Sequence, residues 1–319
     1  MTTNAIPRSL FKYRSFETNT IRMLCQAEVF FAKPSTFNDP FDCNPTVVPD
    51  VDAKEVERLW KNLALKRQVS KDTPKAMAKE KALRELGEHR YNATEYGGRH
   101  DDGGNGSELY VKYLVRDIDA YVKERFKEHG VLSLAARWNC PLMWSHYANE
   151  HRGICIEYTT DDHRCGVLAP VNYNSSRYLK VSDLIEWLLC CSPAARDKVF
   201  EQYFLAKAPQ WKYEREWRVV SKANGRDSRP FRIASVHFGV RCDAAIITAV
   251  VKLLSGSEDD IRFYCMASRD DGFKLKRYEV DPSEIEVFGL RNSPYFELDD
   301  FAFEPTQALG EISGAKLSD

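Results

Sequence analysis

The sequence has no long hydrophobic run and no excess of charge of one sign, and each absence excludes a class of protein. None of its apolar stretches approaches the roughly 20 residues that a membrane-spanning helix needs. Lys and Arg together number 46 and Asp and Glu 47, so the net charge is −1. This balance does not give the global basic surface that is typical of binding to nucleic acids or acidic membranes. The first nine residues also lack the apolar core of a signal peptide, and we therefore expect a cytoplasmic protein that makes no membrane contact.

Motifs for metal binding, phosphate cradles and serine hydrolysis are missing too. The nine cysteines form no C-x-x-C pair, which predicts free thiols in a reducing compartment rather than a disulfide framework. His146 and His151 are five residues apart and H-E-x-x-H is absent, so no metal site is predicted. The sequence contains neither G-x-x-x-x-G-K-[ST], nor G-x-G-x-x-G, nor G-x-S-x-G.

What is present is ample apolar content in a mixed order of elements. Hydrophobic residues make up 43% and aromatic residues 12% of the chain, enough for a packed core. Strand-like and helix-like segments alternate irregularly, which predicts an α+β fold: a single mixed or antiparallel bent sheet with flanking helices. We expect residues 1–50 and 129–285 to form the core with the site. The Lys/Glu/Ala/Leu-rich residues 51–128 are expected to form a helical insertion, and residues 286–319 a tail.

The most informative string is Trp-Lys-Tyr-Glu-Arg-Glu-Trp-Arg at residues 211–218. In a strand, residues two apart share a face, which would put Glu214 and Glu216 side by side, away from the aromatic residues. Two adjacent carboxylates push their pKa values apart, and neighbouring cations keep at least one of them ionised. We interpret Glu214 and Glu216 as a candidate catalytic pair, although a solvated charge ladder above an aromatic core face has the same pattern.

Three further segments carry candidate binding residues. The Pro-braced loop at residues 37–42 contains Asn38, Asp39 and Asp42 and has the composition of a rigid binding loop, or of an Asx-capped turn. On the helix after Pro141, Trp144 and Tyr147 could form a half-exposed stacking surface or belong to the core. In the first strand, Lys12 and Arg14 are expected to be two cations on opposite sides. Arg14 could bind a phosphate or a carboxylate through two hydrogen bonds, or form a surface ion pair.

These strings occur together in a characteristic order. They are Lys12–Arg14 (K-Y-R), Phe37–Asp42 (F-N-D-P-F-D), Val131–Leu134, Leu142–Ile156 (beginning L-M-W-x-H-Y-A) and Trp211–Arg218 (W-x-Y-E-x-E-W-R). Their combination resembles a bacterial family of unknown function, the domain-of-unknown-function family numbered twenty-nine seventy-one, between Leu10 and Val280. The family name implies no established activity.

A more distant resemblance suggests a chemistry. A basic first strand, a serine on a middle strand and E-x-E on a late strand are similar to the arrangement in ADP-ribosyltransferases. This likeness implies that NAD is the substrate and that Arg14 and Ser133 contact it, with Tyr13 where some of these enzymes have a histidine. The sequence lacks a convincing S-T-S motif, in which it departs from that pattern.

The same resemblance implies roles for the other candidates. Glu216 would stabilise the positive charge that develops on the ribose when the nicotinamide bond breaks, and Glu214 would orient the acceptor or accept its proton. Tyr147 or Trp144 would stack on an aromatic ring of NAD. A bacterial enzyme of this kind would be a toxin-like or phage-defence effector that modifies a macromolecular acceptor of unknown identity.

Two other functions fit the same residues. A metal-dependent nuclease could bind Mg²⁺ through Asp39, Asp42, Glu214 and Glu216, and strict dependence on Mg²⁺ would favour it. A non-catalytic ligand-sensing module could use the same pocket, and stoichiometric binding without turnover would favour that function.

Overall fold

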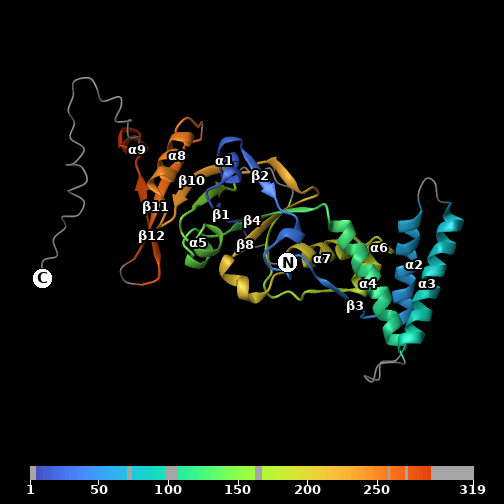
Figure 1. Cartoon of the computed structure of the whole chain (residues 1–319). Helices are drawn as coiled ribbons and strands as arrows, with labels where there is room; N and C mark the ends of the chain where they lie inside the picture. The colour runs from blue at the N-terminus through green and yellow to red at the C-terminus, as the bar shows by residue number, and fades with distance from the viewer. Residues whose placement is uncertain are drawn as a thin grey trace, which may run out of the picture.

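A mixed β-sheet with helices on both faces forms the centre of the protein (Figure 1). The computed structural model describes residues 5–69, 74–97, 106–161, 167–257, 259–269 and 272–288. In this part of the chain eight strands form the main sheet. Their spatial order is β12 (Leu275–Val280), β11 (Arg262–Ser268), β10 (Arg232–Phe238), β5 (Ile154–Thr159), β1 (Ser9–Arg14), β4 (Gly130–Ala135), β8 (Glu216–Ser221) and β6 (Leu168–Pro170). The α+β fold with a mixed sheet that the sequence predicts is confirmed.

Neighbouring strands of this sheet are antiparallel except for β10 and β11, which are parallel. A parallel pair needs a crossover connection, usually a helix, and α8 (Ala244–Leu254) supplies it. The side chain of Asp243 caps α8 by accepting a hydrogen bond from the backbone of Ala245 at 2.7 Å. Two smaller sheets pair β2 (Glu28–Phe31) with β9 (Gly225–Ser228), and β3 (Thr46–Val48) with β7 (Tyr178–Lys180).

The two faces of the main sheet carry separate hydrophobic cores. On one face the strands pack against α1 (Thr18–Cys25) and α8, and this core includes Trp217 and Phe238. On the other face they pack against α5 (Pro141–Tyr147), and this core includes Phe11, Tyr13 and Trp144. Because residues alternate between faces along a strand, neighbouring residues of β1 and β8 contribute to different layers.

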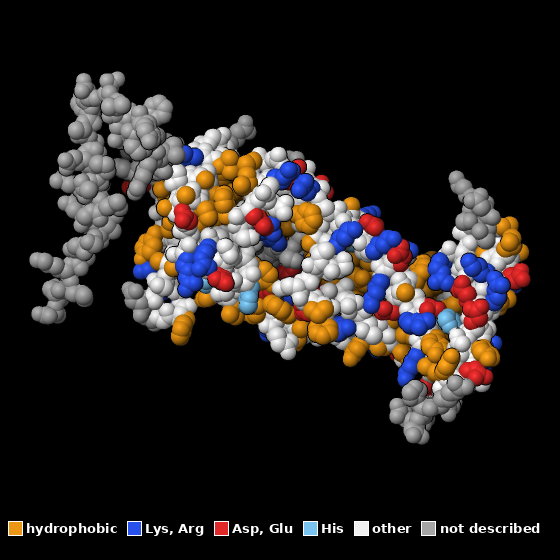
Figure 2. Space-filling model, viewed as in Figure 1, with side chains coloured by type: hydrophobic (Ala, Val, Ile, Leu, Met, Phe, Trp, Pro, Cys, Tyr) orange, Lys and Arg blue, Asp and Glu red, His pale blue; other side chains and the backbone are white. Residues whose placement is uncertain are grey.

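A helical lobe extends from one end of the sheet (Figure 1). It contains α2 (Ala53–Gln68), α3 (Lys75–Gly97) and α4 (Gly106–Phe126), together with α6 (Val181–Leu188) and α7 (Pro193–Phe204) from later in the chain. The buried residues of α2 recur at the spacing of one helix face: Val56, Leu59, Trp60, Leu63 and Ala64. Figure 2 shows Lys and Arg side chains interspersed with Asp and Glu over the outer end of this lobe. Residues 53–126 therefore share their core with α6 and α7.

Two expected boundaries differ from those in the structure. The strand expected from the string at residues 211–218 is wrong in its first half, because Pro209–Glu214 forms a 3₁₀ helix, η2, and β8 begins only at Glu216. The expected tail begins inside α9 (Pro282–Phe288), and residues 289–319 lie outside the described part of the chain.

Eight cysteines are free thiols; Cys165 is not among the described residues. Within the described ranges, every helix is too short or too polar to span a bilayer.

One close approach fixes β1 against the turn that precedes β5. A Cβ atom added to Gly153 would lie 2.2 Å from the Arg14 carbonyl oxygen, closer than any real contact. We expect Gly153→Ala to destabilise the protein by about 1–3 kcal/mol, because the backbone has to move. The matched control is Gly87→Ala in α3, which meets nothing within 4 Å and should stabilise by about 0.5–1 kcal/mol. Equal thermal unfolding of Gly153→Ala and wild type would contradict this account.

Candidate active site

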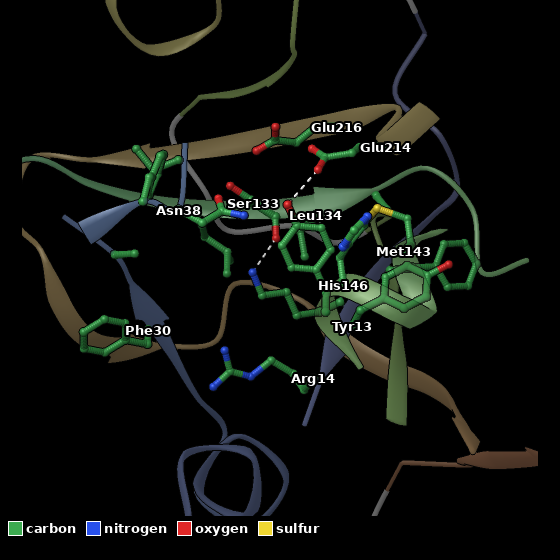
Figure 3. A pocket seen from close by; sticks show the side chains of 18 of the residues that line it. Tyr13, Arg14, Phe30, Asn38, Ser133, Leu134, Met143, His146, Glu214 and Glu216 are labelled. Atoms are coloured by element: carbon green, nitrogen blue, oxygen red, sulfur yellow. Dashed lines mark hydrogen bonds between the residues drawn. The ribbon is translucent and has the colours of Figure 1, made fainter. Parts of the chain in front are cut away.

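A cavity of about 450 Å³ opens where β1 and β4 separate. β1 pairs with β5 from Ser9 to Arg14, but it pairs with β4 only between Phe11 and Ala135. Beyond that point the two strands diverge, and side chains from both line the space between them. Figure 3 shows the residues that surround this cavity. The split between two inner strands of the sheet therefore creates the site.

β1 supplies one wall of the cavity. The expectation that Lys12 and Arg14 lie on opposite sides of this strand is wrong, because residues two apart in a strand project to the same side. Both side chains line the cavity. The Lys12 ammonium donates a hydrogen bond to the Ser133 carbonyl oxygen at 2.7 Å. Tyr13 also borders the cavity, but its side chain projects to the other side of the strand, where its hydroxyl donates to the Arg137 carbonyl at 2.9 Å and its ring packs edge-on against Trp144. Its hydroxyl is thus already engaged within the core.

The opposite wall carries the two glutamates. Glu214 ends η2, the next residue, Arg215, adopts a left-handed backbone conformation with φ of 46°, and Glu216 begins β8. This turn directs both carboxylates to Lys207, whose ammonium lies 2.6 Å from Glu214 Oε2 and 2.9 Å from Glu216 Oε2. Asp42 lies 3.5 Å from the same ammonium. The expected juxtaposition of Glu214 and Glu216 is present, although a turn rather than a continuous strand produces it.

Arg218 anchors this wall from behind. Its side chain is 0% exposed, and each of its five N–H groups has an acceptor. Nε donates to Glu216 Oε1 at 2.8 Å, and Nη2 donates to Glu216 Oε2 at 3.0 Å and to Asp42 Oδ2 at 2.7 Å. Nη1 donates to the Phe204 carbonyl at 2.6 Å and to Cys43 Sγ at 3.1 Å. Glu214, Glu216 and Arg218 are all buried, so the solvated charge ladder is wrong.

The environment separates the proton affinities of the two glutamates. Burial raises the pKa of Glu214, and the attraction of Lys207 only partly offsets this, since Glu216 adds repulsion. Burial also opposes ionisation of Glu216, but Arg218 and Lys207 outweigh it and hold the pKa of Glu216 well below its usual range. Three carboxylates against two cations leave one negative charge when Glu214 is ionised. Glu216 is therefore the permanent anion and Glu214 the group that can exchange a proton.

The loop and helix candidates divide between the cavity and the core. Asn38, Asp42 and Tyr147 line the cavity, and so does Ser133 on β4. The Tyr147 hydroxyl donates to Glu214 Oε1 at 2.7 Å. Two candidates do not line it. Asp39 accepts a hydrogen bond from the Trp211 indole at 2.7 Å, which braces the loop, and fully buried Trp144 donates to the Trp138 carbonyl at 2.7 Å.

The sequence analysis did not select three titratable residues that line the cavity: Lys12, Lys207 and His146. Strand alternation contained the signal for Lys12, since it shares a side with Arg14. His146 lies at the exposed rim, 6.4 Å from the Tyr213 ring, and belongs to the same helical string as Tyr147. Lys207 follows α7 without any motif, and only the tertiary structure brings its ammonium to the carboxylates.

The position of Lys207 bears on metal binding. A divalent cation held by Asp42, Glu214 and Glu216 would have to displace an ammonium that already contacts all three. Within the described ranges, no group of three or more His, Cys, Asp or Glu side chains is arranged to hold a metal ion. The acidic residues are thus paired with cations of the chain itself.

Comparison with known protein families gives a match over part of the chain. Residues 143–219 match the model of the family described as "Protein of unknown function (DUF2971)", which supports the family that the sequence motifs indicate. The matched segment contains Tyr147, Lys207, Glu214, Glu216 and Arg218, whereas the strings around Arg14 and Asn38 precede it. Neither the curated proteins nor the solved structures gave a match.

The two glutamates should respond differently to loss of their charge. Glu216→Gln leaves the buried Arg218 guanidinium without its paired anion, which we expect to cost about 3–5 kcal/mol of the free energy of unfolding. Glu214→Gln leaves two carboxylates for two cations and keeps an acceptor for Tyr147, so its effect should stay within about 1 kcal/mol. Urea denaturation at pH 7 measures both. Equal effects of the two substitutions would show that Arg218 does not depend on Glu216 as described.

Proposed function

We propose that the cavity binds NAD and that the protein is an ADP-ribosyltransferase-like enzyme. The observation that carries this proposal is the charge distribution across one cavity: Lys12 and Arg14 on the β1 side, and the Glu214–Glu216 pair on the opposite side. NAD has a matching polarity, because its diphosphate is anionic and its nicotinamide ring is cationic. A pocket of this volume, with a few convergent polar groups and perturbed pKa values, has the usual character of a small-molecule site.

The proposed reaction breaks the bond between ribose C1′ and the nicotinamide nitrogen. The bonding electron pair leaves with nicotinamide, and positive charge develops at C1′ and the ring oxygen of the ribose. Glu216, ionised at any working pH, stabilises that charge. The acceptor bonds to C1′ through a lone pair, and its proton passes to Glu214, whose raised pKa suits a general base. The products are nicotinamide and the ADP-ribosylated acceptor, or ADP-ribose where water is the acceptor.

Other lining residues fit binding roles. Arg14 faces the cavity with its Nε lacking a partner, and its only ion pair among the described residues is a 3.5 Å contact with Glu17, so it can neutralise a phosphate. The buried Asp42 Oδ1 also lacks a partner and could accept a hydrogen bond from a ligand amide or hydroxyl. Tyr147 presents a ring beside Glu214 on which a flat group could stack.

A role as a toxin-like or phage-defence effector with a macromolecular acceptor remains part of this proposal, as does a cytoplasmic location. The metal-dependent nuclease is less well supported, since Asp39 does not line the cavity and Lys207 lies among the remaining carboxylates. A ligand-sensing module stays open, and it predicts NAD binding without turnover.

The test measures NAD consumption and transfer of ADP-ribose to cell extract, with and without Mg²⁺. Glu214→Gln should lower the rate by roughly 10²–10³-fold, because the proton acceptor is lost while the fold is kept. The wild-type rate should fall as the pH drops through the raised pKa of Glu214, since only the carboxylate can accept a proton.

Glu124→Gln is the control, because Glu124 is an exposed residue whose only described ion pair is with Lys127. Its rate should equal that of wild type. Wild-type protein that leaves NAD intact, with extract present, would overturn the proposal. Nucleic-acid cleavage that requires Mg²⁺ would support the nuclease instead.

A further inference from the structure

The two lysines that line the cavity differ in how their charges are compensated. Lys207 contacts three carboxylates. Lys12 has one hydrogen-bond acceptor, a backbone carbonyl, and among the described residues no carboxylate lies within 4.0 Å of its ammonium. Two of its three N–H donors are therefore available. The Lys12 side of the cavity carries positive charge that the protein does not neutralise.

Lys12 also has a suitable neighbour. Alternate residues of a strand are about 6.8 Å apart, so Lys12 and Arg14 can approach two adjacent anionic groups from the same side. The Arg14 guanidinium is planar and permanently charged, whereas the Lys12 ammonium is a compact point charge. Figure 3 shows Arg14 on the side of the cavity opposite Glu214 and Glu216, and Lys12 also lines the cavity from β1.

We propose that Lys12 and Arg14 together bind the diphosphate of the nucleotide, and that Lys12 makes this binding depend on pH. The inference deepens the proposed function, on which the choice of a dinucleotide ligand rests. It assigns Lys12 a ligand-binding role. Because the Lys12 ammonium has no carboxylate partner among the described residues to give up, binding would replace only its water molecules by phosphate oxygens.

The electrostatic surroundings of Lys12 support the pH dependence. Burial, reinforced by repulsion from Arg14, lowers the pKa of Lys12 to about 8. A bound anion favours the protonated amine, so binding takes up a proton and weakens as the pH rises through 8. The charged groups that shift the pKa of Lys12 come from several elements: Arg14, Glu216, Glu214 and Lys207. Three further titratable residues line the same cavity: Asp42, His146 and Tyr147.

The experiment measures binding of ADP-ribose by calorimetry at pH 7 and pH 9. ADP-ribose has both phosphates esterified, so its charge does not change in this range, and it lacks the bond that the proposed reaction breaks. Wild-type affinity should weaken by about fivefold between the two pH values if the neutral amine binds about tenfold more weakly than the ammonium. Lys12→Arg should bind as wild type at pH 7 and keep that affinity at pH 9. Lys12→Met should bind about tenfold more weakly at pH 7 and show no pH dependence.

The matched control is Lys66→Met, because Lys66 likewise donates to a backbone carbonyl, that of Leu188, but in the helical lobe. It should bind and respond to pH as wild type does. AMP, with a single phosphate, should bind more weakly than ADP-ribose, and Lys12→Met should reduce that difference. Thermal melting verifies that each variant is folded at both pH values.

The outcomes separate this inference from the proposed function. Binding of ADP-ribose with the expected Lys12 dependence, but no NAD turnover, supports the inference and removes the enzymatic proposal. Turnover of NAD that requires Glu214, with the same KM for NAD in Lys12→Met as in wild type, removes the inference alone. Wild-type affinity that is equal at pH 7 and pH 9, or no binding of ADP-ribose at all, also overturns it.

Discussion

The buried guanidinium of Arg218 is the interaction on which the rest of the site depends. Its five N–H groups donate to Glu216 on β8, to Asp42 and Cys43 at the end of the loop that follows Phe37, and to the carbonyl of Phe204, the last residue of α7. These segments belong to the sheet, to the loop that borders the cavity and to the helical lobe. A buried charge destabilises the folded state unless all its partners are in place. Each of these segments therefore needs the others to adopt its folded position. The site and the packing of the lobe on the sheet are thereby parts of one structure.

This anchor explains how the cavity can hold charges of both signs. Opposite charges in one small space would ordinarily pair and close it. Here Glu216 and Asp42 already have Arg218 and Lys207 as partners, and the β-strand holds Lys12 and Arg14 at the other side of the split. Glu214 is the third carboxylate beside two cations, and burial together with repulsion from Glu216 raises its pKa. The cavity stays open because the carboxylates on one wall are paired with Lys207 and Arg218, and the β1 backbone keeps the cations of the other wall away from them.

Features of the sequence that depend on local periodicity predicted the structure well. The irregular alternation of strand-like and helix-like segments predicted the α+β sheet, and the composition of residues 51–128 predicted helices. Glu214 and Glu216 lie side by side, as strand alternation led us to expect. The segment at residues 211–215 failed because Pro209 at the start of η2 and the left-handed Arg215 override the strand pattern. The sequence left open whether Trp144 is exposed or belongs to the core, because residues that share one face of a helix do not reveal what packs against that face. Lys207 could not be found, because its role arises only from contacts distant along the chain.

The separation of β1 from β4 has a consequence for how a ligand is recognised. Where two inner strands part, the peptide groups that would have bonded across the gap face the space between them, and each needs a partner. The Ser133 carbonyl that accepts from Lys12 is one such group. The N–H and carbonyl of Val131 are two more, and both bond to Ala32, just after β2. These main-chain groups of β4 are thus already engaged within the protein, so recognition of a ligand in this opening would depend on the side chains along β1 and β4.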